Sequence, residues 1–234
     1  MKTKKRLFLL LSLLISIQLA CSIGGLLASE DSPRDVVNQL PIPRMNGALL
    51  FSDDCSGNGG AQAMFGDEYM AFSYVDGLCQ ITANANSSVL PVMYAAPIPT
   101  NFIVEYELGI ISANSGSKYG IIFRSDDVSG GLAHYYYITV KPADKSVDFD
   151  VWNNQWLREE SANISSDFLG TDKTTLLRLE VLDNEFRVFL DGVFVIEFMD
   201  DQIVTPGILG ISINSTGAPE TFYYDNLKIY EIIP

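Results

Sequence analysis

Two pairs of acidic residues have the spacing that cleavage of a glycosidic bond would need. Asp148 and Asp150 alternate in SVDFDVW, and Glu105 and Glu107 alternate in VEYEL. Residues two apart in a β-strand project from the same face, roughly 6–7 Å apart. Paired carboxylates are the usual apparatus for this reaction. The alternative is that all four acids are solvent-facing strand residues. His134 is the only histidine and no nucleophile motif surrounds it, so a histidine-based triad is not indicated.

A second group of residues has the chemistry of sugar recognition. Three tyrosines are consecutive at 135–137, and two tryptophans flank the short segment Asn153–Gln155. Aromatic rings can stack on the apolar faces of sugars, while amide and guanidinium groups donate hydrogen bonds to hydroxyls. The alternative is that these aromatic residues fill a core, with Trp152 first among them. The predicted ligand-binding residues are Arg124, Tyr135, Tyr137, Trp152, Asn154 and Trp156.

The first twenty residues have the pattern of an export signal. Lys2, Lys4, Lys5 and Arg6 precede the apolar run 7–17, which is shorter than the roughly 20 residues of a membrane span. Ala20 before Cys21 resembles the lipobox of bacterial lipoproteins, although Gln18 stands where that motif usually has Leu. The resemblance implies that Cys21 carries lipid and anchors the exported chain at the cell membrane or outer surface. Ordinary signal cleavage near Ala20, giving a soluble secreted protein, is the alternative.

The charge excludes one class of partner. The whole chain carries 15 basic and 29 acidic residues, for a net charge of −14. Removing the signal removes four basic residues and no acidic one, which leaves 11 minus 29, or −18. Phosphate binding needs clustered Lys and Arg, so nucleic acid and anionic lipid head groups are disfavoured as partners. Neutral ligands such as carbohydrates, and cations, remain compatible with this surface.

The number of cysteines is odd, which needs an explanation in an exported chain. If Cys21 carries lipid, Cys55 and Cys79 remain as a pair that an oxidising compartment allows to form a disulfide. Two buried free thiols are the alternative. Zinc is disfavoured, because two cysteines and one histidine far apart in sequence do not supply four ligands.

The elements that would position these residues are β-strands. Residues 21–46 mix Gly, Ser, Pro and charges without periodicity and are interpreted as a lipid-anchored tether, followed by one domain over 47–234. Short runs rich in Val, Ile, Tyr and Phe then recur between Gly, Asn and Asp. The predicted strands are 48–54, 70–77, 78–84, 88–96, 102–111, 118–126, 134–142, 146–154, 155–162, 176–183, 185–192, 193–200, 207–215 and 220–232.

Alternation within these runs predicts the fold class. Leu177, Leu179 and Val181 alternate with Arg178 and Glu180, which is typical of half-buried antiparallel strands. Asp-Gly and Asp-Asn pairs lie between the runs, where tight hairpins prefer them. Fourteen candidate strands exceed an immunoglobulin-like domain, so the sequence predicts an all-β, two-sheet antiparallel sandwich.

The order of local patterns resembles concanavalin A-like and laminin-G-like jelly-roll domains, including 3-keto-disaccharide hydrolase-like modules. The segments that carry the resemblance are LFSDDCS, YGIIFRSDD, HYYYITV, VWNNQW, TTLLRLEVLDNEFRVFLDGVFV, GILGISI and FYYDNLKIYE, within residues 48–232. The resemblance implies a jelly-roll sandwich with a concave sheet. That fold hosts sugar binding, hydrolysis and adhesion, so it does not fix a function.

The resemblance also implies a metal site and argues against one reaction. Related sandwiches often bind structural Ca²⁺ near their paired terminal strands, where this chain has Asp53, Asp54 and Asp225. Turn and edge chemistry of Asp is the alternative. Laminarinase-like enzymes carry E-x-D-x-E, which this chain lacks. The leading interpretation is a non-catalytic surface module that binds carbohydrate or another envelope component. A glycoside-processing enzyme and a structural or adhesive protein-interaction domain are the alternatives.

Overall fold

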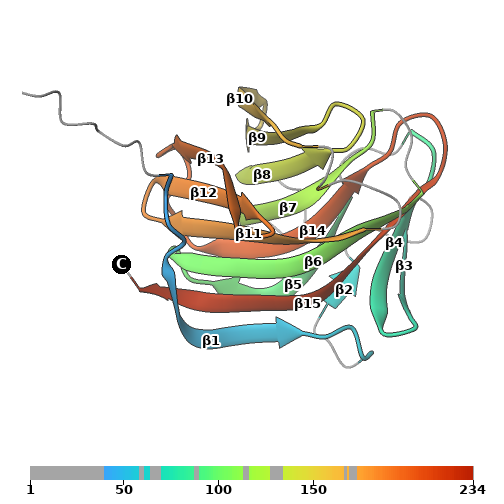
Figure 1. Cartoon of the computed structure of the whole chain (residues 1–234), viewed down its shortest axis with the longest axis horizontal. Coiled ribbons are helices and arrows are strands. Elements are labelled where there is room, and N and C mark those ends of the chain that lie inside the picture. Colours follow the sequence, from blue (N-terminus) through green and yellow to red (C-terminus); the bar gives the residue numbers. More distant parts are fainter. Residues whose placement is uncertain are drawn as a thin grey trace, which may run out of the picture. The chain divides into compact units, whose positions relative to one another are not determined.

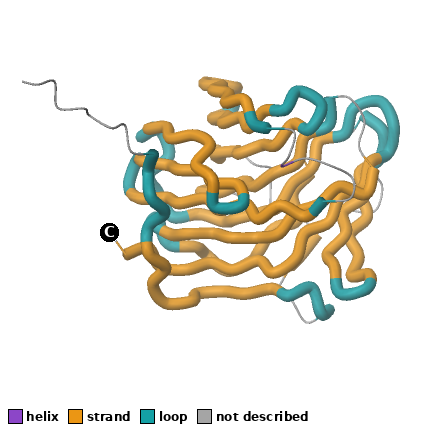
Figure 2. The backbone as a smooth tube through the Cα atoms, in the orientation of Figure 1, coloured by secondary structure: helices purple, strands orange, loops and turns teal. Residues whose placement is uncertain are grey.

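The computed structural model describes residues 40–57, 61–63, 70–86, 90–112, 116–126, 134–165, 168 and 173–233. Strands occupy most of this part of the chain and are joined by short turns (Figure 2). The chain divides into residues 1–40 and residues 41–234, and the second unit contains all of the strands. No helix among the described residues is long and apolar enough to cross a membrane.

The strands form two antiparallel sheets that pack face to face (Figure 1). The first sheet has the order β13-β12-β11-β6-β15-β4-β3, with β1 also paired to β15, and the second has the order β10-β9-β8-β7-β14-β5-β2. The strands are β1 (Met45–Asp53), β2 (Ala61–Ala63), β3 (Met70–Val75), β4 (Leu78–Ala83), β5 (Leu90–Ile98), β6 (Phe102–Ser112), β7 (Lys118–Ser125), β8 (His134–Lys141), β9 (Ser146–Asn153), β10 (Trp156–Asn163), β11 (Thr174–Leu182), β12 (Glu185–Leu190), β13 (Val193–Met199), β14 (Gly207–Asn214) and β15 (Glu220–Ile233).

Alternating apolar residues of both sheets fill the space between them. Leu177, Leu179 and Val181 of β11 are fully buried in this core, as the period-two pattern predicts. Aromatic rings at its centre stack closely, for example Phe149 and Phe198, whose centroids are 3.7 Å apart. The predicted all-β antiparallel sandwich is therefore confirmed.

Most strand ends differ from the predicted ones by at most two residues, and two strands differ by more. β2 is only three residues long, and its sequence Ala-Gln-Ala lacks the β-branched and aromatic residues that mark a strand. β1 begins at Met45, two residues before the predicted start of the domain, because its first residues pair with the end of β15. Tertiary pairing, rather than local composition, determines both elements.

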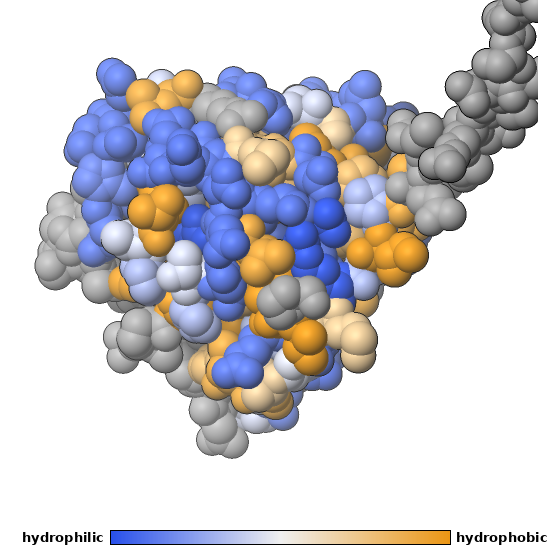
Figure 3. Space-filling model, turned by 90° about the vertical axis from the view of Figure 1, so that its left-hand side faces the viewer, coloured by the Kyte–Doolittle hydropathy of each residue, from blue (hydrophilic) through white to orange (hydrophobic). Residues whose placement is uncertain are grey.

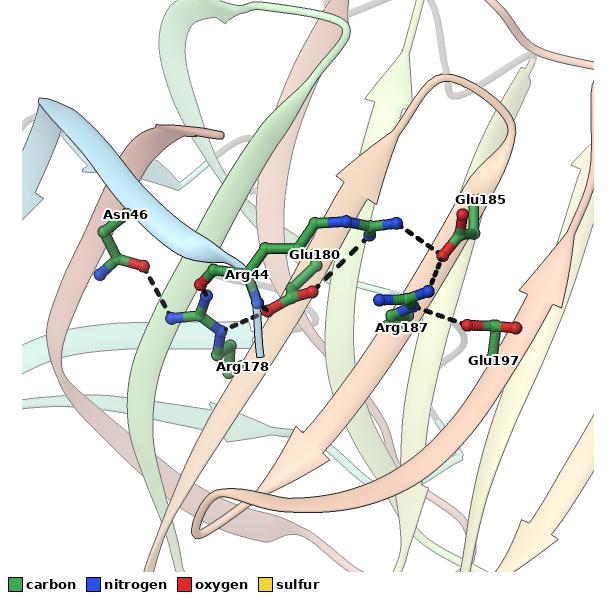
Figure 4. Close-up of polar contacts among 7 residues, drawn as sticks. All are labelled: Arg44, Asn46, Arg178, Glu180, Glu185, Arg187 and Glu197. Carbon is green, nitrogen blue, oxygen red and sulfur yellow. Dashed lines mark hydrogen bonds and ion pairs between the residues drawn. The ribbon is translucent and has the colours of Figure 1, made fainter. Parts of the chain in front are cut away.

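Residues 44–46 fasten the N-terminal end of the sandwich to the outer face of the first sheet (Figure 4). The Arg44 backbone N–H donates to Glu180 Oε1 at 2.8 Å, and Arg178 donates to Asn46 Oδ1 at 2.7 Å. The Arg44 guanidinium also donates to Glu185 at 2.6 Å. Glu180 is fully buried here and pairs with Arg178, so this charge network is part of the folded domain.

A disulfide joins Cys55 and Cys79 (S–S 2.07 Å, Cα–Cα 5.2 Å), which confirms the predicted pair. Cys55 follows the end of β1, and Cys79 lies in β4. β1 and β4 each pair with a different part of β15, β1 with its C-terminal part and β4 with its N-terminal part. The disulfide therefore connects two strands that follow one another along the same side of β15, opposite β6.

Candidate functional site

The predicted aromatic residues gather on the outer face of the second sheet. Tyr136, Ile138 and Val140 of β8 point into the core, so their neighbours in sequence point outward. Tyr135 and Tyr137 form, with Ile122 and the half-buried Trp152, a separate aromatic cluster on that outer face. The hairpin from β9 to β10 then places Trp156 directly across from Trp152.

Three of these rings contact one another. Tyr135 stacks on Trp152 with 6.3 Å between ring centroids, and Trp156 meets Trp152 edge-on at 4.9 Å. Trp156 also meets the Tyr135 ring edge-on at 6.2 Å. Trp156 is 50% exposed, whereas Tyr135 is only 5% exposed. The cluster therefore presents one accessible indole that is held in place by two neighbouring rings.

Carboxylates of β9 and β10 lie beside this aromatic cluster. Asp148 accepts hydrogen bonds from Ser146 Oγ (3.0 Å) and Ser161 Oγ (2.7 Å), and it forms an ion pair with Lys141. Asp150 lies opposite Glu159 in the antiparallel register. Because both members of such a pair project from the same face, Asp150 and Glu159 are neighbours on the outer face.

Asp150 is the carboxylate with the most perturbed environment. Its side chain is buried, and its nearest cation is Lys118 Nζ, 3.7 Å from Oδ2. That oxygen has no hydrogen-bond partner among the described residues. Burial raises the pKa of Asp150 to about 6, with smaller contributions from Glu159 and Asp148 that Lys118 and Lys141 partly offset. Asp150 is therefore a carboxyl group that can hold a proton near neutral pH.

A pocket of about 260 Å³ opens between the acids and the exposed indole. The described residues that line it are Asp150, Trp156, Leu157 and Glu159. Lys118 Nζ lies 5.9 Å from the ring centroids of both Tyr137 and Trp156, within the range of a cation–π interaction. The pocket thus combines an aromatic wall with hydrogen-bond acceptors, the combination expected at a polar-ligand site.

Two other predicted binding residues have different positions. Asn154 is exposed in the β9–β10 turn, where its left-handed backbone (φ 56°) makes the tight reversal, and its amide nitrogen lies 3.2 Å from His134 Nε2. It therefore borders the outer face. His134 in turn contacts Asp126 through Nδ1. Tyr137 is fully buried in the floor of the cluster beside Ser212.

Arg124 does not lie on this face. Its backbone is left-handed (φ 51°), which breaks the alternation of β7 and turns the side chain inward. The buried guanidinium donates to the carbonyl oxygens of Ile203 (2.9 Å), Thr100 (2.9 Å) and Asp183 (2.6 Å). It also lies over the Phe186 ring, 5.3 Å from its centroid. Arg124 joins three loops at one end of the sandwich, so the prediction that it binds ligand is corrected.

The two predicted acid pairs lie on opposite faces of the sandwich. Asp148 and Asp150 belong to the outer face of the second sheet, whereas the Glu105 carboxylate accepts a hydrogen bond from the Arg178 guanidinium on the first sheet (2.5 Å). Sequence reasoning missed Glu159, Leu157 and Lys118 as neighbours of Asp150. The hairpin register that begins at Trp152 and Trp156 would have placed Arg158 opposite Asp150, and a register shift between Trp156 and Arg158 places Glu159 there instead.

The predicted calcium ligands make local contacts instead of converging. Asp53 Oδ1 accepts the Cys55 N–H (2.9 Å), and Asp54 Oδ1 accepts the Ser56 N–H (3.1 Å). Asp225 Oδ1 accepts the Asn226 N–H (2.7 Å). Among the described residues, the only group of three or more possible metal-ligand atoms within 4.8 Å of one another is an Asp53 carboxylate oxygen with the sulfurs of Cys55 and Cys79. Because these two sulfurs form a disulfide, they are not available as thiolate ligands. A calcium ion bound by Asp53, Asp54 and Asp225 remains a prediction.

Comparison with known proteins shows the fold. No protein-family model and no curated protein sequence matches this chain. Among solved structures, the carbohydrate-binding module CBM66 from Bacillus subtilis is similar over 82% of this chain and 100% of its own, with a TM-score of 0.57 and 17% identity. A Bacillus subtilis protein of unknown function with a galectin-like fold is similar over 82% of this chain and 99% of its own, with a TM-score of 0.64 and 13% identity.

A β-glucanase from Bacillus licheniformis is similar over 80% of this chain and 100% of its own, with a TM-score of 0.60 and 13% identity. The sandwich therefore has a concanavalin-like, galectin-like jelly-roll fold, and the concanavalin-like jelly roll that the sequence resemblance implied is confirmed. At these identities the comparisons establish the fold alone, and the outer face of the second sheet remains a candidate site on the evidence of its own residues.

Proposed function

We propose that this chain is a non-catalytic surface module that binds carbohydrate on the outer face of the second sheet. The observation that carries the proposal is the half-exposed Trp156, supported by Trp152 and Tyr135 and bordered by Asp150 and Glu159. An indole offers a flat apolar plate to a sugar ring, and carboxylates accept hydrogen bonds from its hydroxyls. The names of similar structures, a carbohydrate-binding module and a β-glucanase, agree with a carbohydrate ligand.

The test is a panel of immobilised and soluble glycans, scored for both retention and product release. We expect retention of the purified chain without release of shorter sugars. Trp156→Ala should lower retention at least tenfold, because a central aromatic contact typically contributes about 2 kcal/mol to binding. Tyr230→Ala is the matched control, since Tyr230 is a half-buried aromatic residue of β15 in the first sheet. Equal loss in both variants, or no retention, would contradict the proposal.

A glycoside hydrolase is the second candidate, and one observation favours it. Asp150 lines the pocket with a pKa raised to about 6 by burial, which is the property of a general acid. Product release that Asp150→Asn abolishes would establish this activity and replace the binding proposal. A protein partner captured by crosslinking, without retention on any glycan, would favour an adhesive domain.

The proposed location is the cell surface, with export by residues 1–20 and lipid attachment at Cys21. The Cys55–Cys79 disulfide agrees with an oxidising compartment. The envelope partner would then be a surface glycan, and the membrane would contact the chain through the lipid. Metabolic labelling with a tritiated fatty acid tests this directly. Labelled wild-type chain and unlabelled Cys21→Ala are expected, whereas an unlabelled wild-type chain would contradict it.

A further inference from the structure

The acidic residues at the pocket outnumber the cations that neutralise them. Asp148, Asp150 and Glu159 bring three carboxylates together, and the described lysines beside them are Lys118 and Lys141. Lys141 Nζ pairs with Asp148 and lies 3.5 Å from Glu159 Oε1, while Lys118 Nζ is 3.7 Å from Asp150 Oδ2. Both lysines are therefore paired with carboxylates, and among the side chains that the structure describes at the pocket, three acids against two lysines leave one negative charge.

A buried acceptor oxygen gives an independent indication that the pocket takes a ligand. Asp150 is 3% exposed, and its Oδ2 has no hydrogen-bond partner among the described residues. A buried polar atom without a partner costs free energy, so it marks a place where a donor would be stabilised. Asp150 lines the same pocket as Glu159 and Trp156, so a ligand on the indole can reach the carboxylate.

The aromatic rings already accept a cation. Lys118 Nζ lies 5.9 Å from the centroids of Trp156 and Tyr137, so an ammonium group is favoured beside these rings and the acids. Sulfated or uronic sugars would meet these carboxylates, and the two described lysines are already paired with them.

From the negative charge of the described side chains, the buried Asp150 oxygen that accepts no hydrogen bond from them and the aromatic wall, we infer that the preferred ligand is a carbohydrate bearing a free amine, an amino sugar in its ammonium form. The inference rests on the proposed carbohydrate-binding function. The ammonium group would donate to Asp150 Oδ2 and Glu159, while the sugar ring stacks on Trp156. Binding involves no covalent step, and only the amine distinguishes this ligand from its N-acetylated or neutral counterpart.

The experiment compares three tetrasaccharides with the purified full-length chain by calorimetry at pH 6.5. The probes are the glucosamine tetramer, its N-acetylated form and cellotetraose. We expect the glucosamine tetramer to bind at least tenfold more tightly than the other two. Asp150→Asn should remove this preference, whereas Glu107→Gln, which removes a carboxylate from the first sheet, should keep it. Trp156→Ala should weaken the binding of all three tetrasaccharides, because each would stack a sugar ring on this indole. A general attraction to an acidic protein would not depend on the indole.

The outcomes separate this inference from the function on which it rests. Equal affinity for the amine and N-acetylated tetramers, with loss in Trp156→Ala, would overturn the amine preference and leave carbohydrate binding supported. A preference that survives Asp150→Asn, or that Glu107→Gln removes equally, would assign it to overall charge and overturn the inference. A chain that binds no tetramer and is retained on no glycan would overturn the proposed function itself.

Discussion

Asp150 and Asp148 are two residues apart on one strand, yet their surroundings differ. Asp148 accepts hydrogen bonds from Ser146 and Ser161 and pairs with Lys141. Asp150 is buried, and its nearest ammonium group, Lys118 Nζ, lies 3.7 Å from Oδ2. Burial raises its pKa from 3.8 to about 6. A buried carboxyl with a raised pKa favours folding while it is protonated and opposes folding once it ionises. The two acids should therefore respond to neutralisation with opposite signs.

We predict that Asp150→Asn stabilises the protein at pH 8 and has little effect at pH 4. The wild type loses the contribution of the protonated group as pH rises through about 6, and the amide never ionises. A shift of this size corresponds to no more than about 3 kcal/mol, at about 1.4 kcal/mol per pKa unit. Urea unfolding at both pH values measures the gain.

Asp148→Asn is the matched control, because it removes the carboxylate that pairs with Lys141 and accepts hydrogen bonds from Ser146 and Ser161. We expect it to lower the free energy of unfolding at pH 8 by about 1–3 kcal/mol. Destabilisation by Asp150→Asn at pH 8, of the same size as in the control, would refute the account of the Asp150 environment.

Arg124 supports the fold through three backbone carbonyls. We predict that Arg124→Met lowers the free energy of unfolding by about 3 kcal/mol, because charge-assisted hydrogen bonds to Ile203, Thr100 and Asp183 are lost in a buried setting. Arg187→Met is the control, since Arg187 pairs with partly exposed Glu185 and Glu197 and such pairs contribute less than about 1 kcal/mol. Chemical denaturation measures the free energy of unfolding of both variants. Equal losses would contradict a stabilising role for the three hydrogen bonds of Arg124.

At the scale of elements, the sequence predicted what depends on local alternation. Fourteen of the described strands correspond to predicted runs rich in β-branched and aromatic residues, and several of these runs also alternate with period two. β2 was missed since three residues without β-branched side chains carry no such pattern. Residues 44–46, here called the Arg44 strap, belong to the segment that the sequence analysis interpreted as a tether. Their contacts with Glu180 and Glu185 join residues more than 130 positions apart, so no local pattern indicates them.

The sequence named the aromatic residues of the candidate site and the acids Asp148 and Asp150, but it did not indicate Glu159. Tyr135, Trp152 and Trp156 could be proposed from residue type, because exposed rings near a turn suggest a sugar plate. The neighbours of Asp150 depend on hairpin register and on β7 lying beside β8, which no local pattern fixes. Arg124 was misplaced because its positive φ reverses the direction that alternation implies.

The disulfide is an element-scale device whose loss should be measurable. We predict that the double variant Cys55→Ala/Cys79→Ala lowers the free energy of unfolding by about 3 kcal/mol, because a link spanning 24 positions restricts the unfolded chain. Adding a reductant to the wild type should produce the same loss, and the variant should not respond to it. A variant as stable as the oxidised wild type would show that the link adds nothing to stability.

At the scale of the whole molecule, the two outer faces carry different chemistry. The first sheet is crossed by the Arg44 strap and its charge network, whereas the second sheet carries the aromatic cluster and the pocket. The described residues on the face shown in Figure 3 form a mixture of hydrophilic areas and separate hydrophobic areas. The arrangement leaves the outer face of the second sheet as the surface most suited to a ligand.

Both tryptophans of the chain lie in the aromatic cluster, so their fluorescence reports on the candidate site alone. The most direct test is a fluorescence titration with a glycan that retains the protein. We predict a saturable change in emission whose midpoint matches the retention constant, with at least a tenfold weaker midpoint in Trp156→Phe. Retention of the glycan without any change in tryptophan emission would contradict binding on the outer face of the second sheet.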